Sequence, residues 1–239
     1  MHFHLPKPLH GWREFAGEVG IIVVGVLIAL GAEQVVETVH WRDEVAAERK
    51  SLVAEANDGL GAVAARQAQQ PCVDRRLREI RLVLERHHFN EPLGLLREIG
   101  RPSTEVAARG TWQIALTGQA LSHMSDKEKL SFSDAFANLE LWERISIEEK
   151  TIWLRLAPLN LPDLLSEEDW SGIRSAYAQA VIYNDHIRIL APWEEQQVHK
   201  DLPQVEKPRV ADNLAAFNGM VDQICKPILA PAPAPAEAG

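Results

Sequence analysis

The chain has 239 residues, which is room for one ordinary domain and an appendage. Hydrophobic residues make up 46% of it and charged residues 25%, and this near-average composition excludes a wholly disordered chain. The formal net charge is -9, from 34 acidic against 25 basic residues, so no general affinity for nucleic acid is expected. The two cysteines are too few for a disulfide-built scaffold or a four-thiolate zinc site.

The N-terminal forty residues are far more apolar than the rest of the chain. We predict a short tail over residues 1–14 and a transmembrane helix over residues 15–36. The uncharged run Val19–Ala32 is by itself shorter than the roughly 20 residues that cross a hydrocarbon core. Trp12 and Trp41 flank the segment, and a helix between them spans about 44 Å, close to a full bilayer with its headgroup zones. Tryptophan prefers that interfacial depth, which favours a retained membrane anchor.

Two other interpretations of the apolar segment stay open. The residues around Leu30 resemble the small-x-small site at which a signal peptide is cleaved, although Glu14 and Glu18 precede the apolar core. A buried helix of a soluble protein is the third interpretation, because the uncharged run is short. The numbers of lysines and arginines on the two sides do not decide the orientation. A short tail inside and a large domain outside is the common single-pass arrangement.

Four residues of the apolar segment fall on one helical stripe, namely Glu18, Gly25, Ala29 and Ala32. Small residues four positions apart allow two helices to approach closely in lipid, and a carboxylate facing a partner helix is less costly than one facing lipid. The stripe therefore indicates a homo-oligomeric contact through the membrane helix. The alternative is that Glu18 lies near the headgroups and the small residues share its stripe by chance.

The rest of the chain predicts an all-α fold, an irregular helical bundle outside the membrane over residues 37–226. No proline occurs between Pro8 and Pro71, so the membrane helix is expected to continue outward without a break. Apolar residues recur every seven positions along it, which indicates one face of a bundle helix or a membrane-proximal coiled coil: Val39, Ala46, Val53 and Leu60.

Caps and prolines mark the later elements. Prolines 192, 203 and 208 are expected to interrupt the stretch before the last helix, and the Pro/Ala-rich tail 227–239 is expected to be disordered. The five expected helices run over Pro71–His88, Ser103–Leu121, Ser125–Leu156, Ser166–Ile187 and Val210–Ile224.

The two cysteines lie at opposite ends of the helical domain. Cys72 follows the proline that opens a helix, and Cys225 lies at the end of the last expected helix. In an oxidising compartment a bond between them would join the C-terminal helix to the early helices. Two separate buried thiols are an equally supported alternative.

No catalytic, metal or cofactor residue is predicted. Glu37 and His40 have the spacing of one half of a di-iron motif, but a di-iron bundle needs two such pairs together with further carboxylates, and no metal site is predicted from this spacing. The sequence has no nucleophile elbow, no phosphate-binding glycine loop and no Cys-x-x-Cys. The densest basic row is expected to be a solvated helix face: Arg75, Arg76, Arg78, Arg81 and Arg86.

The N-terminal segment resembles the start of a group of uncharacterised bacterial single-pass membrane proteins. The similarity rests on Gly17-Glu18, on Gly25-Val26-Leu27-Ile28-Ala29-Leu30, and on the charged helix that begins at Trp41-Arg42-Asp43-Glu44. It covers about a sixth of the chain. The resemblance implies an anchored domain of unknown function and brings no catalytic residues with it.

These observations favour a non-enzymatic interaction, scaffolding or sensing domain, held at the bacterial inner membrane and facing the periplasm. The expected partners are the lipid bilayer and a second copy of the chain, and not nucleic acid. Two alternatives remain, a membrane-tethered enzyme with an unrecognised site and a secreted helical binding protein after signal cleavage.

Overall fold

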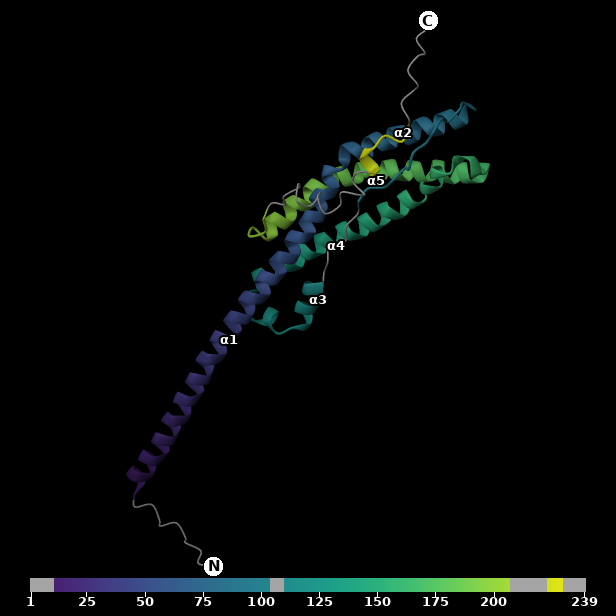
Figure 1. Cartoon of the computed structure of the whole chain (residues 1–239). Helices are drawn as coiled ribbons and strands as arrows, with labels where there is room; N and C mark the ends of the chain where they lie inside the picture. Colours follow the sequence, from purple (N-terminus) through teal and green to yellow (C-terminus); the bar gives the residue numbers. More distant parts are fainter. Residues whose placement is uncertain (1–10, 104–109, 207–222, 230–239) are drawn as a thin grey trace, which may run out of the picture.

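The computed structural model describes residues 11–103, 110–206 and 223–229. Within these ranges the chain forms five α-helices and three short 3₁₀ helices, and the one pairing of extended residues is a bridge between Leu96 and Leu229. Figure 1 shows an elongated molecule in which one end of the first helix extends alone and the other helices pack around and beyond its second half. The predicted all-α class, with a long apolar helix leading into further helices, is confirmed.

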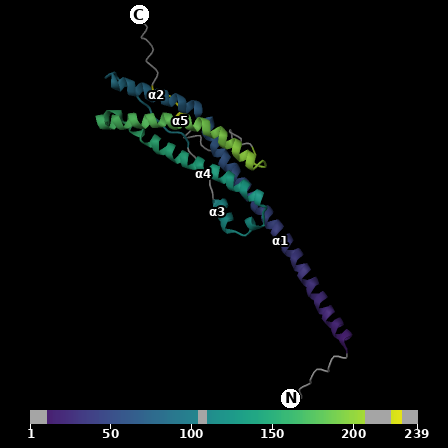
Figure 2. The ribbon, with the colours of Figure 1, turned by 180° about the vertical axis from the view of Figure 1, so that it is seen from behind.

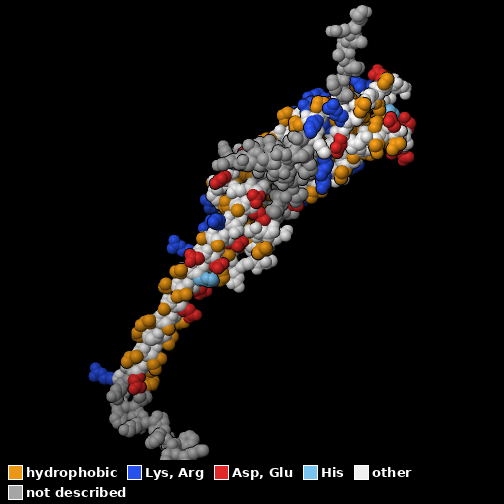
Figure 3. Space-filling model, in the orientation of Figure 1, with side chains coloured by type: hydrophobic (Ala, Val, Ile, Leu, Met, Phe, Trp, Pro, Cys, Tyr) orange, Lys and Arg blue, Asp and Glu red, His pale blue; other side chains and the backbone are white. Residues whose placement is uncertain are grey.

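The first helix, α1 (Trp12–Ala68), has 57 residues and is therefore about 86 Å long. Every side chain from Phe15 to His40 is exposed, and burial begins at Trp41 and Val45. Apolar side chains dominate the extended part in Figure 3. Among the described residues, α1 is the one helix long and apolar enough to cross a membrane, a test that a signal sequence also passes. The expected continuation of this helix into the bundle is confirmed.

Pro71 separates α1 from α2 (Gln70–His88). A proline has no N–H to donate and its ring crowds the carbonyl four residues earlier, so an α-helix cannot pass through it unchanged. Proline is tolerated in the first turn of a helix, which is where Pro71 lies in α2. The chain consequently changes direction here, and α2 continues past the end of α1 (Figure 1).

The next described elements form a small lobe beside α1. They are α3 (Gly110–Thr117) and the 3₁₀ helix η1 (Ala120–His123). Figures 1 and 2 place this lobe at the end of the bundle from which the extended part of α1 emerges. The helix expected to start at Ser103 is described only from Gly110 onward, because residues 104–109 lie outside the described ranges.

The long helices α4 (Asp126–Leu154) and α5 (Glu167–Asp201) form an antiparallel pair. Ser125 and Ser166 cap them as expected, each accepting a backbone N–H of the first turn. The expected interruption at Pro192 is wrong, since α5 continues through it. Both Pro192 and Arg188 are exposed, so water can reach the Arg188 carbonyl that has lost its helical donor.

Three hydrophobic clusters follow one another along the bundle. One joins the first bundle turns of α1 to the start of α4 and the end of α5, through residues such as Leu52, Phe136 and Val198. The middle cluster contains Trp142 between α1 and α5. The third joins α2 to the α4–α5 connection. This serial arrangement gives a long, narrow bundle, with one end where the exposed part of α1 emerges and the other at α2.

The face that α1 buries is not the predicted stripe throughout. Val39 and Ala46 are exposed, and the buried positions are Val45, Leu52, Ala56, Leu60 and Val63. Their spacings of seven, four, four and three are those of an ordinary bundle helix, because 3.6 residues per turn drift relative to a strict seven-residue repeat. Over the packed part of α1, the structure therefore fits the first interpretation of the stripe, that it forms one face of a bundle helix.

The C-terminal predictions fall largely outside the described residues. Of the helix expected over Val210–Ile224, residues 207–222 are not described, and a short helical turn covers residues 223–225. Of the tail expected from residue 227, the described part ends at Leu229, and Ile228 within it is fully buried. Ile228 and Leu229 are thus packed against the bundle, and residues 230–239 lie outside the described ranges.

Candidate functional site

The predicted membrane stripe lies on the exposed part of α1. Glu18, Gly25, Ala29 and Ala32 are all exposed, and a methyl group added at Gly25 would meet no atom within 4 Å. The described part of the chain therefore leaves this face uncovered. The contact with a second membrane helix stays a prediction.

A groove lies where the extended part of α1 enters the bundle. It encloses about 560 Å³ and is lined by one face of α1 together with His123 of η1. The Trp41 indole stacks on the His123 imidazole, with ring centres 4.0 Å apart and planes 14° apart. The lining residues are Gln34, Glu37, Thr38, Trp41, Arg42, Val45, Arg49 and His123.

A buried carboxylate holds the lobe that supplies His123. Glu55 of α1 is 6% exposed and accepts the Thr111 and Trp112 backbone N–H groups at 2.9 and 2.7 Å. These are free donors of the first turn of α3, where a negative charge is favourable. The Trp112 ring stacks on Phe136 of α4, with centres 4.9 Å apart. The lobe is thereby fixed to two long helices, and its position relative to α1 is defined.

The groove contains charges of both signs. Arg49 pairs with Glu128 of α4, and this hydrogen bond raises the pKa of Arg49. The Glu37 carboxylate accepts the Trp41 indole N–H at 3.4 Å, a long contact that leaves most of its acceptor capacity free. Arg42 is exposed and has no partner among the described residues. An arginine with five donors is thus available at the mouth of the groove.

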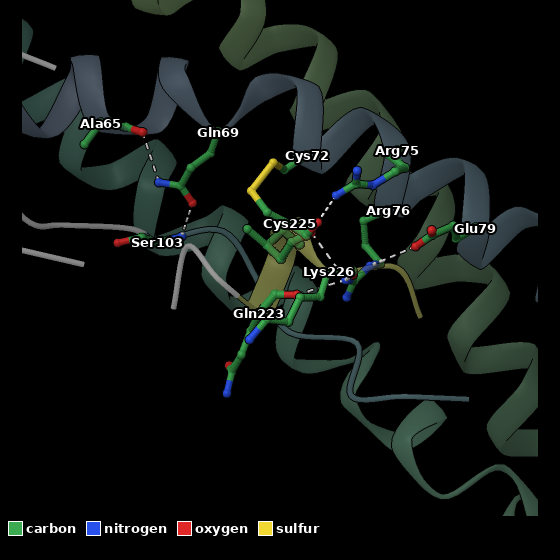
Figure 4. Close-up of a disulfide and its surroundings, with 11 residues drawn as sticks. Ala65, Gln69, Cys72, Arg75, Arg76, Glu79, Ser103, Gln223, Cys225 and Lys226 are labelled. Carbon is green, nitrogen blue, oxygen red and sulfur yellow. Dashed lines mark hydrogen bonds and ion pairs between the residues drawn. A yellow bond between two sulfur atoms is a disulfide. The ribbon is translucent and has the colours of Figure 1, made fainter. Parts of the chain in front are cut away.

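At the other end of the bundle, Cys72 and Cys225 lie at disulfide distance. Their sulfur atoms are 2.03 Å apart and their Cα atoms 4.8 Å apart, across 153 positions of sequence. Figure 4 shows the bond joining the first turn of α2 to the C-terminal segment 223–229. Of the two interpretations of the cysteines, the pair fits the structure and two separate thiols do not.

The basic row of α2 is not wholly solvated, contrary to expectation. Arg76 is 1% exposed, and burial lowers its pKa to about 10, so it stays charged at pH 7. Arg75 donates to the Cys225 carbonyl (Figure 4). The Arg76 guanidinium donates to the backbone carbonyls of Glu98, Gln223, Ile224 and Lys226. Both arginines therefore hold the C-terminal segment against α2.

A buried polar network joins four helices in the middle of the bundle. Arg66 of α1 donates two hydrogen bonds, of 2.9 and 2.7 Å, to the Glu149 carboxylate of α4. It also donates to Gln70 and to Asn184 of α5. Asn184 in turn donates to Asp74 of α2 at 2.7 Å. Because these side chains supply one another's hydrogen-bond partners, we interpret the network as a structural element and not as a reactive site.

One buried carboxylate lacks such partners. Glu194 of α5 is fully buried, and neither of its oxygens has a hydrogen-bond partner among the residues that the structure describes. Burial raises the pKa of Glu194 to about 7. It lies between the buried residues Ala191 and Val198 on the face of α5 that packs into the bundle. Because it is fully buried in the packed face of α5, we expect its protonation to affect the stability of the bundle.

The described residues offer no metal centre. No group of three histidine, cysteine, aspartate or glutamate side chains within them is placed to hold an ion. Glu37 belongs to the groove, whereas His40 lines a separate pocket on the lobe side of α1. No protein-family model, no curated protein and no solved structure matches the chain.

Proposed function

We propose that the protein is a membrane-anchored helical domain of the bacterial inner membrane that acts by interaction, scaffolding or sensing and not by catalysis. The observation that carries this proposal is the exposure of α1 from Phe15 to His40, in direct continuity with the buried face that starts at Val45. An apolar helix of this length left uncovered in water would expose far more apolar surface than a soluble monomer tolerates. Lipid removes that cost.

The proposed location of the bundle is the periplasm. The pairing of Cys72 with Cys225 supports it, because disulfides persist in oxidising compartments and are rare in the bacterial cytoplasm. In this arrangement residues 1–14 lie on the cytoplasmic side and α1 crosses the membrane once over residues 15–36.

We also propose that two copies associate through the membrane helix. The uncovered stripe formed by Glu18, Gly25, Ala29 and Ala32 supports this, since small residues allow close packing and a partner helix would shield the carboxylate. Gly25→Leu tests the contact, because the larger side chain keeps the helix apolar and blocks close approach. Crosslinking in bilayers is expected to fall for this variant, with Gly20→Leu as a control off the stripe.

Membrane fractionation with protease access tests the main proposal. The intact protein should stay in the membrane pellet after an alkaline carbonate wash. In spheroplasts, protease added outside should degrade the bundle while a tag at residue 1 stays protected. N-terminal sequencing of the membrane-bound protein should recover residues ahead of Leu30. A protein released whole by carbonate, or one whose mature N-terminus follows Gly31, would contradict the proposed anchoring.

A further inference from the structure

We propose that the groove between α1 and η1 binds a membrane phospholipid with an ethanolamine headgroup. In this complex Arg42 donates hydrogen bonds to the phosphodiester, and Glu37 accepts hydrogen bonds from the ammonium group. The proposal rests on the anchoring proposed above. It assigns a ligand class to a site that anchoring alone does not require.

The groove lies at the depth of the headgroups. The predicted span ends at Val36, and the groove is lined from Gln34 outward. The headgroup zone on one side of a bilayer is about 5–8 Å thick. The five steps along the helix from Val36 to Trp41 cover about 7.5 Å of its axis. The groove therefore extends from the edge of the hydrocarbon core through the zone that phosphate groups occupy.

The direction of α1 turns its cations toward the bilayer. In an α-helix each Cα–Cβ bond tilts toward the N-terminus, and long side chains follow that tilt. The N-terminus of α1 is its membrane end, so Arg42 and Arg49 lean back toward the lipid. Glu128 already holds Arg49, whereas Arg42 has no partner among the described residues. Arg42 is thus the cation that a phosphodiester can engage.

The charge pattern of the groove favours a zwitterion over a simple anion. Arg42 and Glu37 both line it, and the Arg49 charge is offset by Glu128. A headgroup that carries only negative charge would pair with Arg42, but it would leave the Glu37 carboxylate without a cation partner and repel it. An ethanolamine headgroup places its phosphate against the guanidinium and donates its three ammonium N–H groups to the carboxylate. Both charges then have partners.

The neighbouring lobe permits close approach to lipid. No Asp, Glu, Lys or Arg occurs from Gly110 to Ser125. Two apolar residues of α3 are exposed there, Ile114 at 70% and Leu116 at 58%. Trp41 at the back of the groove is of the type that prefers the interface. The chain carries a net charge of -9, yet the run from Gly110 to Ser125 offers lipid an uncharged surface beside the groove that Arg42 lines.

Lipid titration of the full chain in mild detergent, followed by native mass spectrometry, tests the proposal. The probes are phosphatidylethanolamine, phosphatidylcholine, whose quaternary nitrogen donates no hydrogen bond, and diacylglycerol, which has no phosphate. Phosphatidylethanolamine should bind most tightly and diacylglycerol least. Arg42→Gln should weaken phosphatidylethanolamine binding about tenfold, the loss of one charge-assisted hydrogen-bonded pair. Glu37→Gln should make the ethanolamine and choline lipids bind equally.

The control variant is Arg81→Gln, which removes an exposed arginine of α2 far from the groove and should bind as the wild type does. Unchanged binding by Arg42→Gln, or equal binding of diacylglycerol, would overturn the proposal. Soluble glycerophosphoethanolamine that binds as tightly as the lipid would also overturn it, because the ligand would then be a free phosphodiester. The carbonate wash is run on the same variants. All should stay in the membrane, so release of the wild type would count against the anchor and not against the groove.

Discussion

Replacing Glu194 by glutamine should raise the stability of the bundle at alkaline pH and remove one component of its pH dependence. Glu194 is fully buried without a hydrogen-bond partner in the described part of the chain, and its pKa is raised from 4.5 to about 7. A carboxyl group with a raised folded-state pKa binds its proton more tightly in the folded chain than in the unfolded chain. The stability that this tighter proton binding contributes is therefore fully present below the pKa of the unfolded chain, and it is lost as the pH rises through about 7.

The size of the effect follows from that shift. The shift from 4.5 to about 7 is about 2.5 pKa units, and each unit corresponds to about 1.4 kcal/mol, so the effect is on the order of 3 kcal/mol. Glu194→Gln should thus resemble the wild type at pH 5 and exceed it by that amount at pH 8. For a chain of this size the gain corresponds to a rise of about 5–10 °C in the midpoint of thermal unfolding.

Circular dichroism of the full chain in detergent, recorded from pH 5 to pH 8, measures this difference. The informative quantity is the stability of the variant minus that of the wild type at each pH, because this difference cancels the contributions of all groups that the two proteins share. Glu91→Gln removes an exposed carboxylate beyond α2 and serves as the control with no expected trend. A difference between Glu194→Gln and wild type that stays constant from pH 5 to pH 8 would refute the assignment of a raised pKa to this buried group.

Three further predictions concern the contacts that hold the bundle together. Cys72→Ser should lower the free energy of unfolding by up to about 5 kcal/mol, given the long loop that the bond to Cys225 closes, and reduction should leave the variant unchanged in thermal unfolding. Glu149→Leu alone should lower the free energy of unfolding by about 3–5 kcal/mol, because it leaves the buried Arg66 charge without its carboxylate partner. In denaturant titrations, combining it with Arg66→Met should recover most of that loss. Glu55→Ala should lower the free energy of unfolding by about 1–3 kcal/mol, since it removes the acceptor for two N–H groups of α3. Amide exchange should become faster selectively in residues 110–123. An equal change in exchange throughout the chain would show that Glu55 does not hold the lobe.

The elements whose signals are local could be predicted from the sequence. The absence of proline between Pro8 and Pro71 predicted one unbroken first helix, and Ser125 and Ser166 predicted where two long helices begin. Caps and proline geometry act within one turn of the chain, so they hold whatever the helix later packs against. Pro192 is the exception, because an exposed proline in a long, well-packed helix loses one hydrogen bond and does not end the helix.

The features that depend on distant segments could not be predicted. The face that α1 buries is set by α4 and α5, and a seven-residue pattern did not select it. Arg76 belongs to an apparently solvated basic row, and its role depends on carbonyl groups about 150 positions later in the chain. Two signals were nevertheless present in the sequence. Asn184 and Glu194 are the two polar residues on the buried stripe of α5, and the uncharged run from Gly110 to Ser125 marks the lobe beside the groove.

The unbroken course of α1 has a mechanical consequence for an anchored chain. If the chain is anchored as proposed, the helix that crosses the membrane also supplies the first buried face of the bundle, with no flexible linker between the two parts. The bundle must therefore follow any change in the tilt of the membrane helix. From Trp41 to Ala68 the helix extends about 40 Å, so a change in tilt of about 20° displaces its far end by about 14 Å. Contacts made by the stripe around Gly25 in the membrane would thus set where the distal end of the bundle lies, and a headgroup bound beside Arg42 would act at the pivot of that motion.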